Sequence, residues 1–247
     1  MSGLNLAGDV YLDRYVNGTR VGEYGPINAR AFNITLPEAN TITRKSYKRD
    51  SYGNTLDSVV QATGSGSVSV EIDDADPDIL AMALLGTVGD NDASSGSVTD
   101  ENVTAAHDLW RKLDHRSVSN VVVQDVTDTT TYVSGTDYTI NASSGMIKVL
   151  SSGSIADGAT LHVDYDYAAL TSRQILAVQD TEVRSFVRLD GTNLANQKKV
   201  ELTIPEAALI PSGDIGLISD DFVTYTLSGE IILRDGESAA FTYNEID

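Results

Sequence analysis

The sequence predicts an all-β fold with one short helix. Apolar residues alternate with polar ones over short segments, the pattern of strands that bury one face. Turn-forming dipeptides separate these segments, and strands joined by such turns are typical of sandwiches and barrels. One stretch instead carries apolar residues at helical spacing, which indicates a helix packed on a sheet.

The strand predictions rest on apolar residues at every second position. The clearest sets are Phe32, Ile34 and Leu36; Val68, Val70 and Ile72; and Val200, Leu202 and Ile204. Four dipeptides tolerate positive φ and predict tight turns: Asn17-Gly18, Asp157-Gly158, Asp190-Gly191 and Asp235-Gly236. Together they predict short strands connected by turns along most of the chain.

The helix is predicted to begin after Asp76. Asp76 suits its N-cap, Pro77 its first turn and Gly86 its C-terminal end. Its apolar stripe consists of Ile79, Leu80, Ala83 and Leu84. The aspartates around its start (Asp73, Asp74, Asp76 and Asp78) fit capping and helix-dipole stabilisation better than a cation site.

A change in composition after the helix predicts an inserted domain. Residues 89–96 are rich in Asp, Asn, Gly and Ser, as in a linker. Strand signals follow from about residue 107 to residue 167, at residues 121–123, 131–133, 146–150 and 161–167. Alternating apolar residues resume at Ile175. We therefore expect a linker and small β-domain at 89–169, inserted into a main domain made of residues 1–88 and 170–247.

Composition excludes several classes of protein. The formal net charge of −19 argues against a conventional nucleic-acid reader, which needs clustered Lys and Arg. The lack of cysteine excludes disulfides, thiolate metal sites and cysteine nucleophiles. No apolar run approaches the roughly 18 residues needed to cross a bilayer. The N-terminus lacks the basic start and apolar core of a signal peptide, so we expect cytoplasmic synthesis and no membrane partner.

The sequence contains no recognisable catalytic constellation, and we expect neither enzymatic activity nor a cofactor. His107, His115 and His162 lie on predicted strands without the spacing of a zinc protease, and we expect structural histidines. Neither a nucleophile elbow nor a phosphate-binding glycine loop is present. Trp110, the only tryptophan, is expected to pack inside the inserted domain.

One linker segment partly matches a calcium-binding loop. Asp90, Asp92, Ser94 and Glu101 fall at its ligand positions, but Ser95 stands where the loop requires glycine. A solvated linker explains these residues better, so no metal site is predicted.

Two segments have no obvious place in a compact monomer. Residues 37–57 form a long polar stretch, and such a loop is usually functional or disordered. It holds four of the chain's 17 basic residues, Arg44, Lys45, Lys48 and Arg49. The second segment is the N-terminal arm before Asp9. A basic loop on an acidic protein suits contact with another copy, and simple mobility is the alternative.

A series of segments in fixed order carries a resemblance to a known family. The first part contributes residues 30–36, the polar loop with Arg44 and Ser46, residues 67–72 and a helix at 78–85. The last part contributes residues 186–193, 199–205 and 222–233. In this order the chain resembles the major tail tube proteins of long-tailed, non-contractile bacteriophages. The insertion is similar to a small β-domain of phage tail proteins, through residues 135–140, 145–147 and 163–167.

The resemblance implies a β-sandwich with a flanking helix that forms hexameric rings. Stacked rings would form a tube lined by a continuous barrel of strands, through which phage DNA passes without sequence-specific binding. A closed barrel would remove exposed sheet edges. The implied partners are other copies, the tape measure protein, the tail terminator and the distal tail proteins. The implied location is the virion tail, assembled in the host cytoplasm.

The resemblance also gives the charged segments roles. The 37–57 loop would contact neighbouring subunits or rings through its four basic residues, and the inserted domain would decorate the tube exterior. Acidic side chains in the lumen would repel DNA phosphates, and Glu71 and Glu201 are the candidates because alternation places them opposite apolar faces. The alternatives are a tail terminator, a tube protein of a contractile or secretion system, or a carbohydrate-binding adhesin.

Overall fold

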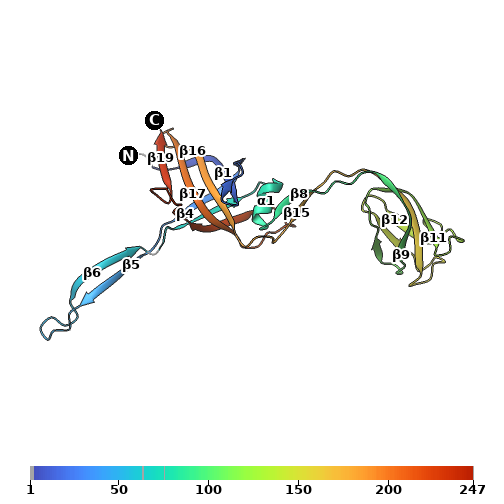
Figure 1. Ribbon diagram of the computed structural model, residues 1–247, viewed down its shortest axis with the longest axis horizontal. Helices are drawn as coiled ribbons and strands as arrows, with labels where there is room; N and C mark the ends of the chain where they lie inside the picture. The colour runs from blue at the N-terminus through green and yellow to red at the C-terminus, as the bar shows by residue number, and fades with distance from the viewer. Residues whose placement is uncertain (1–2, 63, 75, 247) are drawn as a thin grey trace. The chain divides into compact units, whose positions relative to one another are not determined.

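The computed structural model describes residues 3–62, 64–74 and 76–246 and confirms an all-β fold with one short helix (Figure 1). The chain divides into two compact units. Unit 1 comprises Met1–Gly89 and Ile175–Asp247, and unit 2 comprises Asp90–Gln174. The sequence analysis placed the inserted segment at 89–169. Where the chain passes from unit 1 to unit 2 and back, β8 (Thr87–Asp90) and β15 (Arg173–Leu176) pair as a two-stranded sheet.

Unit 1 is built on a nine-stranded antiparallel sheet. Its order is β2-β1-β16-β17-β18-β7-β4, with β3 beside β1 and β19 beside β17. The strands are β1 (Leu6–Val16), β2 (Thr19–Arg20), β3 (Tyr24–Ile27), β4 (Ala29–Thr35), β7 (Ser67–Ile72), β16 (Val183–Asn193), β17 (Lys199–Ser212), β18 (Tyr225–Ile231) and β19 (Thr242–Ile246).

One face of this sheet and the helix enclose the core of unit 1. The predicted apolar sets on β7 and β17 are buried there: Val68, Val70, Ile72, Val200, Leu202 and Ile204. The third set is only partly confirmed, because Phe32 and Ile34 are half-buried on β4. Leu36 lies beyond the end of β4 and is 65 % exposed, so the alternation overran the strand.

The helix α1 (Pro77–Ala83) begins as predicted. The Asp76 carboxylate accepts hydrogen bonds from the backbone N–H groups of Asp78 and Ile79, at 2.8 and 3.4 Å. The buried face differs from the predicted stripe, since it consists of Ile79, Ala81, Met82 and Ala83. Within the described residues, no helix is both long and apolar enough to cross a membrane.

A bulge divides β17 into two segments. Pro205 and Glu206 together oppose Phe186 of β16, because Ile204 pairs with Val187 and Ala207 pairs with Ser185. Proline donates no backbone hydrogen bond and is tolerated at such bulges. On the other edge, β17 pairs with β19 before the bulge and with β18 after it. The bulge therefore marks the point where β17 changes partner.

Three of the four predicted turns are present, and the fourth prediction is wrong. Asn17-Gly18 joins β1 to β2 with φ of 50° and 79°, and Gly158 and Gly236 also have positive φ. Asp190 and Gly191 instead lie inside β16, paired with Asp9 and Gly8 of β1. A Cβ on Gly191 would lie 2.7 Å from the backbone oxygen of Ala7. This glycine therefore permits close strand packing.

Two predictions of irregular structure are also wrong. Much of the 37–57 segment belongs to a β-hairpin of β5 (Ala39–Lys45) and β6 (Thr55–Ala62). The predicted N-terminal arm is partly strand, because β1 begins at Leu6 and pairs with β16. Asn5 also exchanges hydrogen bonds with the turn after β16, while Met1 and Ser2 lie outside the described residues.

Unit 2 contains two three-stranded sheets around its own core, as in a small sandwich. One sheet has the order β11-β14-β9 and the other β10-β13-β12. Their bounds are β9 (Gly96–Thr104), β10 (Trp110–Lys112), β11 (Val118–Asp125), β12 (Tyr138–Asn141), β13 (Met146–Val149) and β14 (Thr160–Tyr167). The core residues buried most completely are Leu113, Val123, Ile147, Ile155, Leu161 and Val163.

Three expectations for unit 2 are corrected. The sequence analysis missed β9 because its acidic and hydroxyl residues resemble a linker. Residues 131–133 form no strand, only an isolated bridge from Thr131 to Gln124. Trp110 is 44 % exposed and lies 5.2 Å from the Lys148 ammonium group, so it does not pack in the core.

The close approach of β1 and β16 can be tested at Gly8. A Cβ there would lie 2.5 Å from the backbone oxygen of Asp190 and from the Cα of Gly191, which forces the strands apart. We expect Gly8→Ala to lower the free energy of unfolding of unit 1 by about 1–3 kcal/mol, measured by calorimetry. Gly89→Ala is the control, since its Cβ meets nothing within 4 Å. Equal destabilisation in both variants would contradict this explanation.

Candidate assembly surfaces

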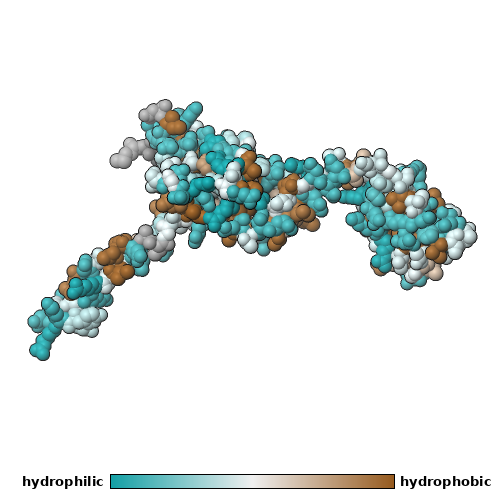
Figure 2. Space-filling model, viewed as in Figure 1, coloured by the Kyte–Doolittle hydropathy of each residue, from teal (hydrophilic) through white to brown (hydrophobic). Residues whose placement is uncertain are grey.

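The β5–β6 hairpin is the segment of unit 1 with the least support from its own chain. Every residue of β5 is exposed, and among the described residues β5 and β6 pair only with each other. Ile42, Val59 and Val60 are 55 %, 61 % and 65 % exposed. Figure 2 shows hydrophobic residues (brown) at the surface of this hairpin. Contiguous exposed apolar residues mark interaction sites in soluble proteins.

The hairpin ends in an ordered tip. The backbone N–H of Ser46 donates to Asn54 O and that of Gly53 donates to Ser46 O, both at 2.8 Å. Tyr47 and Tyr52 pack edge to face with ring centroids 5.9 Å apart, and their side chains remain largely exposed. The tip therefore presents two aromatic rings in a fixed arrangement.

The structure brings the four predicted contact residues onto this hairpin. Arg44 and Lys45 end β5, and Lys48 and Arg49 lie in the tip. All four are exposed, and Arg44 lies opposite Asp57 in the strand register. No ion pair to a carboxylate forms at any of the four within the described part of the chain. Their charges are therefore available to a partner.

The sheet face opposite the core carries a grid of mostly polar residues on β4, β7, β18 and β17, interrupted by Ala31, Ala208 and Ile210. Its three cross-strand rows are Ala31–Glu71–Thr226–Ser212, Asn33–Ser69–Ser228–Ile210 and Thr35–Ser67–Glu230–Ala208. None of these residues is buried. We call this set the polar grid. It contains two glutamates and no lysine or arginine, so it offers phosphate groups no cationic contact.

Both predicted lumen candidates lie on this non-core face. Glu71 is half-buried within the polar grid, between Ala31 and Thr226. Glu201 is half-buried on β17, opposite Asp190 of β16. The structure thus places both on one face of one sheet, but in different parts of it. The alternation of polar and apolar residues in the sequence identified this face. The rows of hydroxyl residues around Glu71 could be recognised only from the register of the paired strands.

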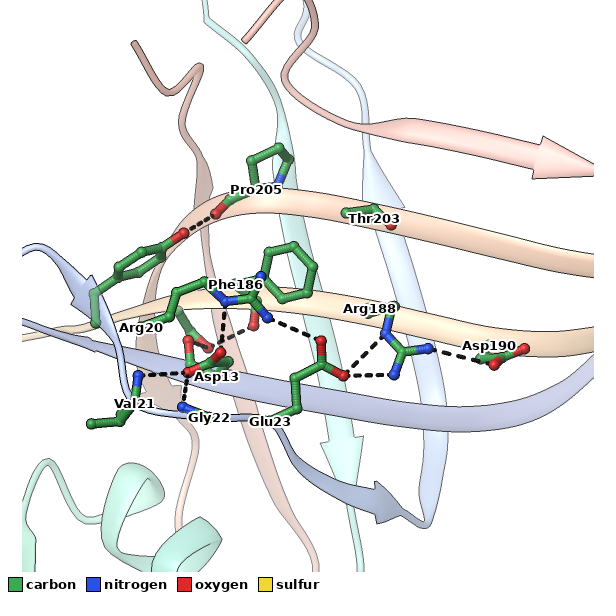
Figure 3. Close-up of polar contacts among 12 residues, drawn as sticks. Asp13, Arg20, Val21, Gly22, Glu23, Phe186, Arg188, Asp190, Thr203 and Pro205 are labelled. Carbon is green, nitrogen blue, oxygen red and sulfur yellow. Dashed lines mark hydrogen bonds and ion pairs between the residues drawn. The ribbon is translucent and has the colours of Figure 1, made fainter. Parts of the chain in front are cut away.

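A network of alternating charges covers another part of the non-core face (Figure 3). Arg20 bonds to Asp13 at 2.6 Å and to Glu23 at 2.9 Å. Arg188 bonds to Glu23 at 2.6 Å and to Asp190 at 3.4 Å. The hydrogen bond from Arg188 is the main cause that lowers the pKa of Glu23. These arginines are therefore neutralised by carboxylates of their own chain.

Aromatic rings hold the same arginines flat against the sheet. The Arg20 guanidinium lies 3.7 Å from the ring centroid of Phe186, and that of Arg188 lies 4.1 Å from Tyr11. Asp13 is only 2 % exposed and also accepts hydrogen bonds from the backbone of Val21 and Gly22, at 3.0 and 2.8 Å. The network thereby fixes the segment after β2 onto the sheet.

A further exposed apolar segment escaped the sequence analysis. Leu217, Ile218 and Phe222 are 70 %, 99 % and 91 % exposed in the loop between β17 and β18. The segment 222–233 carries part of the resemblance, but β18 begins only at Tyr225, so Phe222 lies in the loop before it. In the sequence, large apolar residues among Asp, Ser and Gly could have indicated this exposed segment. Their exposure marks a second candidate contact surface in unit 1.

Two residues of the calcium-loop match, Asp92 and Glu101, accept hydrogen bonds from other groups. Asp92 accepts a hydrogen bond from Ser172 N at 2.9 Å. Glu101 accepts one from Asp114 N at 3.1 Å and another from the Tyr165 hydroxyl. Burial, followed by this hydrogen bond to Glu101, raises the pKa of Tyr165. These acidic residues serve local structure.

The three histidines have different surroundings, and only His162 lies on a strand. A ring nitrogen of His107 lies 2.8 Å from Ile155 O, which ties two loops together. His115 stacks on Tyr167 with ring centroids 3.7 Å apart. His162 on β14 lies 2.7 Å from a carboxylate oxygen of Asp128. His107 and His115 therefore have packing or hydrogen-bonding roles, and His162 lies in a cluster of possible metal ligands.

Asp13 provides a test of the charge network. Asp13→Asn removes the charge that pairs with Arg20, while Arg20 is 39 % exposed and can be hydrated. We therefore expect a loss of about 1–3 kcal/mol in the free energy of unfolding of unit 1, below the cost of breaking a fully buried pair. Asp190→Asn is the control, with a side chain 56 % exposed. Chemical denaturation of both variants measures this loss. An unchanged denaturation midpoint in Asp13→Asn would refute the stabilising role of Asp13.

Comparison with known proteins identifies a family. A family model described as "Protein of unknown function UCP028589" matches residues 4–240. No curated protein matches the chain. The match covers unit 2 and most of both parts of unit 1. The chain therefore belongs to the family UCP028589.

Proposed function

We propose that this chain is a non-enzymatic structural protein that polymerises, as the major tail tube protein of a long-tailed, non-contractile phage. The β5–β6 hairpin is the observation that carries the proposal. An isolated two-stranded hairpin is at best marginally stable in water. This one exposes apolar residues on its strands and carries aromatic and basic residues at its tip. Packing against another copy gives the hairpin the buried surface that its own chain does not supply.

Charge complementarity favours a second copy as the partner. The chain carries a formal charge of −19, whereas Arg44, Lys45, Lys48 and Arg49 concentrate positive charge on the hairpin. A basic hairpin is attracted to the acidic surface of an identical chain, and such complementarity also fixes the register of contact. In the proposed tube, the hairpin joins neighbouring subunits or neighbouring rings of a hexameric stack.

The polar grid supports the proposal that the non-core face of the sheet lines the lumen of the tube. Hydroxyl groups and carboxylates without cations give DNA phosphates no ion-pairing partner, and like charge keeps the DNA mobile. Glu71 within the grid, and Glu201 on the same sheet face, are the proposed lining acids. Unit 2, inserted into a surface connection, is proposed to lie on the tube exterior.

The remaining partners follow from the resemblance alone. A tail tube of this kind contacts the tape measure protein, the tail terminator and distal tail proteins, and it resides in the virion after assembly in the host cytoplasm. These assignments are part of the proposal. The ability of the chain to polymerise by itself is the property that can be tested first.

Negative-stain electron microscopy of the concentrated, purified protein tests the proposal. We expect long hollow tubes of uniform width, with light scattering that grows with protein concentration. Single rings that never stack would favour a tail terminator, and monomers at every concentration would contradict self-assembly of the chain alone. A reconstruction of the tube should place Glu71 and Glu201 on its inner wall. A position on the outside would end the assignment for that residue.

Charge reversal on the hairpin tests the proposed contact. We expect that changing Arg44, Lys45, Lys48 and Arg49 to Glu abolishes tubes, because the hairpin then repels the acidic partner surface. The circular dichroism spectrum and the melting temperature should stay unchanged, since these side chains are exposed. The control reverses three exposed basic residues of unit 2, Arg111, Lys112 and Arg116. Normal tubes from the hairpin variant, or loss of tubes from both, would refute a specific role.

A further inference from the structure

Three side chains from distant parts of the sequence converge in unit 2. They are Asp100 on β9, Asp128 in the turn after β11 and His162 on β14. Their ligand atoms all lie within 4.8 Å of one another. The Nδ1 atom of His162 lies 2.7 Å from a carboxylate oxygen of Asp128 and 3.6 Å from one of Asp100. One imidazole nitrogen and two carboxylates therefore face a common point.

The backbone around this point is held by contacts independent of the three ligands. The Asp125 carboxylate accepts hydrogen bonds from the N–H groups of Thr129 and Thr130, at 2.8 and 2.9 Å, and these fix the turn that presents Asp128. The hydrogen bond from Thr130 N–H, followed by one from the Thr127 hydroxyl, is the main cause that lowers the pKa of Asp125 to about 2. On β9, the N–H of Asp100 donates to the Asp164 carboxylate at 2.8 Å. Both carboxylate ligands thus extend from defined backbone positions.

The charges around His162 favour a cation. The carboxylates of Asp128 and Asp100 face its ring at the distances given above, and the Asp164 carboxylate lies beside them, accepting a hydrogen bond from the Asp100 N–H. Its cross-strand neighbours, Asn102 on β9 and Gln124 on β11, are neutral. Side chains of His162 and Asp128 are 16 % and 49 % exposed, so an ion can enter from solvent. The site is therefore open to solvent and negatively charged.

We propose that unit 2 binds a divalent transition-metal ion of the Zn²⁺ type through His162, Asp100 and Asp128. Zinc binds imidazole nitrogen and carboxylate oxygen at about 2.0–2.2 Å, and three protein ligands plus a water complete its tetrahedron. At those bond lengths, neighbouring donors lie roughly 3.3 Å apart. The two observed nitrogen–oxygen separations fall on either side of this value. All three ligand atoms lie within 4.8 Å of one another, so binding would draw them closer to this spacing.

The ligand set argues against calcium or magnesium. Those ions take oxygen ligands, and calcium takes six to eight of them, whereas this site offers one nitrogen and two carboxylates. The bound ion would connect an edge strand, the central strand β14 and the turn after β11 in one sheet. Binding therefore stabilises unit 2, whatever role the rest of the chain has.

Isothermal titration of the untagged full-length chain with ZnCl₂ tests the site. We expect one ion per chain, and an affinity at least about tenfold lower in His162→Gln and in Asp128→Asn. His107→Gln is the matched control, because its ring contacts a backbone carbonyl outside the site, and its affinity should equal the wild type. Asp128 lies on an exposed turn, so Asp128→Asn should fold even if His162→Gln, which changes a residue of strand β14, does not. Unchanged affinity in Asp128→Asn, or equal loss in His107→Gln, overturns the proposal.

Two further readouts separate this site from non-specific binding to an acidic protein. Zinc affinity should fall as pH falls through the pKa of His162, because a proton then competes for Nδ1. Zinc should also raise the melting temperature of the unit 2 transition, and excess CaCl₂ should neither displace the ion nor reproduce this shift. Zinc binding that is independent of pH, or is displaced by calcium, would show adsorption to surface carboxylates and overturn the proposal.

Discussion

The bulge at Pro205 and Glu206 is the constraint on which unit 1 depends. It lets β17 pair with β19 along one segment and with β18 along the next, while β16 continues along its other edge. Polar groups of both bulge residues have hydrogen-bond partners, and the Glu206 backbone oxygen accepts a hydrogen bond from Ile232 N at 2.9 Å. The Tyr15 hydroxyl donates to Pro205 O at 2.8 Å, and Arg184 and Arg234 bond to the Glu206 carboxylate. The bulge thus bends the sheet around its core without leaving these polar groups unpaired.

A single curled sheet gives the unit two chemically different faces. Val, Leu and Ile fill one face together with α1, whereas the other face is divided between the charge network and the polar grid. In the network, each of Arg20 and Arg188 contacts two carboxylates and an aromatic ring. Such arginines contribute to folding and already contact carboxylates, whereas the four basic residues of the hairpin are exposed and form no ion pair within the described residues.

The sequence predicted features whose cause is local and missed those whose cause is a neighbouring strand. Alternation on β7 and the N-cap at Asp76 depend on residues next to each other, and both predictions are confirmed. Gly191 was misassigned because its need for space comes from β1, which is distant in sequence. The β5–β6 hairpin was missed because it buries neither face, so it has no polar–apolar period to detect. The cluster of Asp100, Asp128 and His162 was missed for the same reason as Gly191, since the pairing of β9 and β11 with β14, together with the turn after β11, brings these residues together.

The balance of charge in the whole chain explains why the basic residues of the hairpin matter. A chain with a formal charge of −19 repels its own copies, and this repulsion acts over about 8 Å at physiological ionic strength. Apolar contacts are short-ranged and non-directional, so the exposed residues of the hairpin could not by themselves select one orientation. In the proposed assembly, the four clustered cations of the hairpin reverse the sign of the interaction where they meet an acidic surface. This attraction would orient two otherwise repelling chains, and burial of the apolar residues on β5 and β6 would then hold them together.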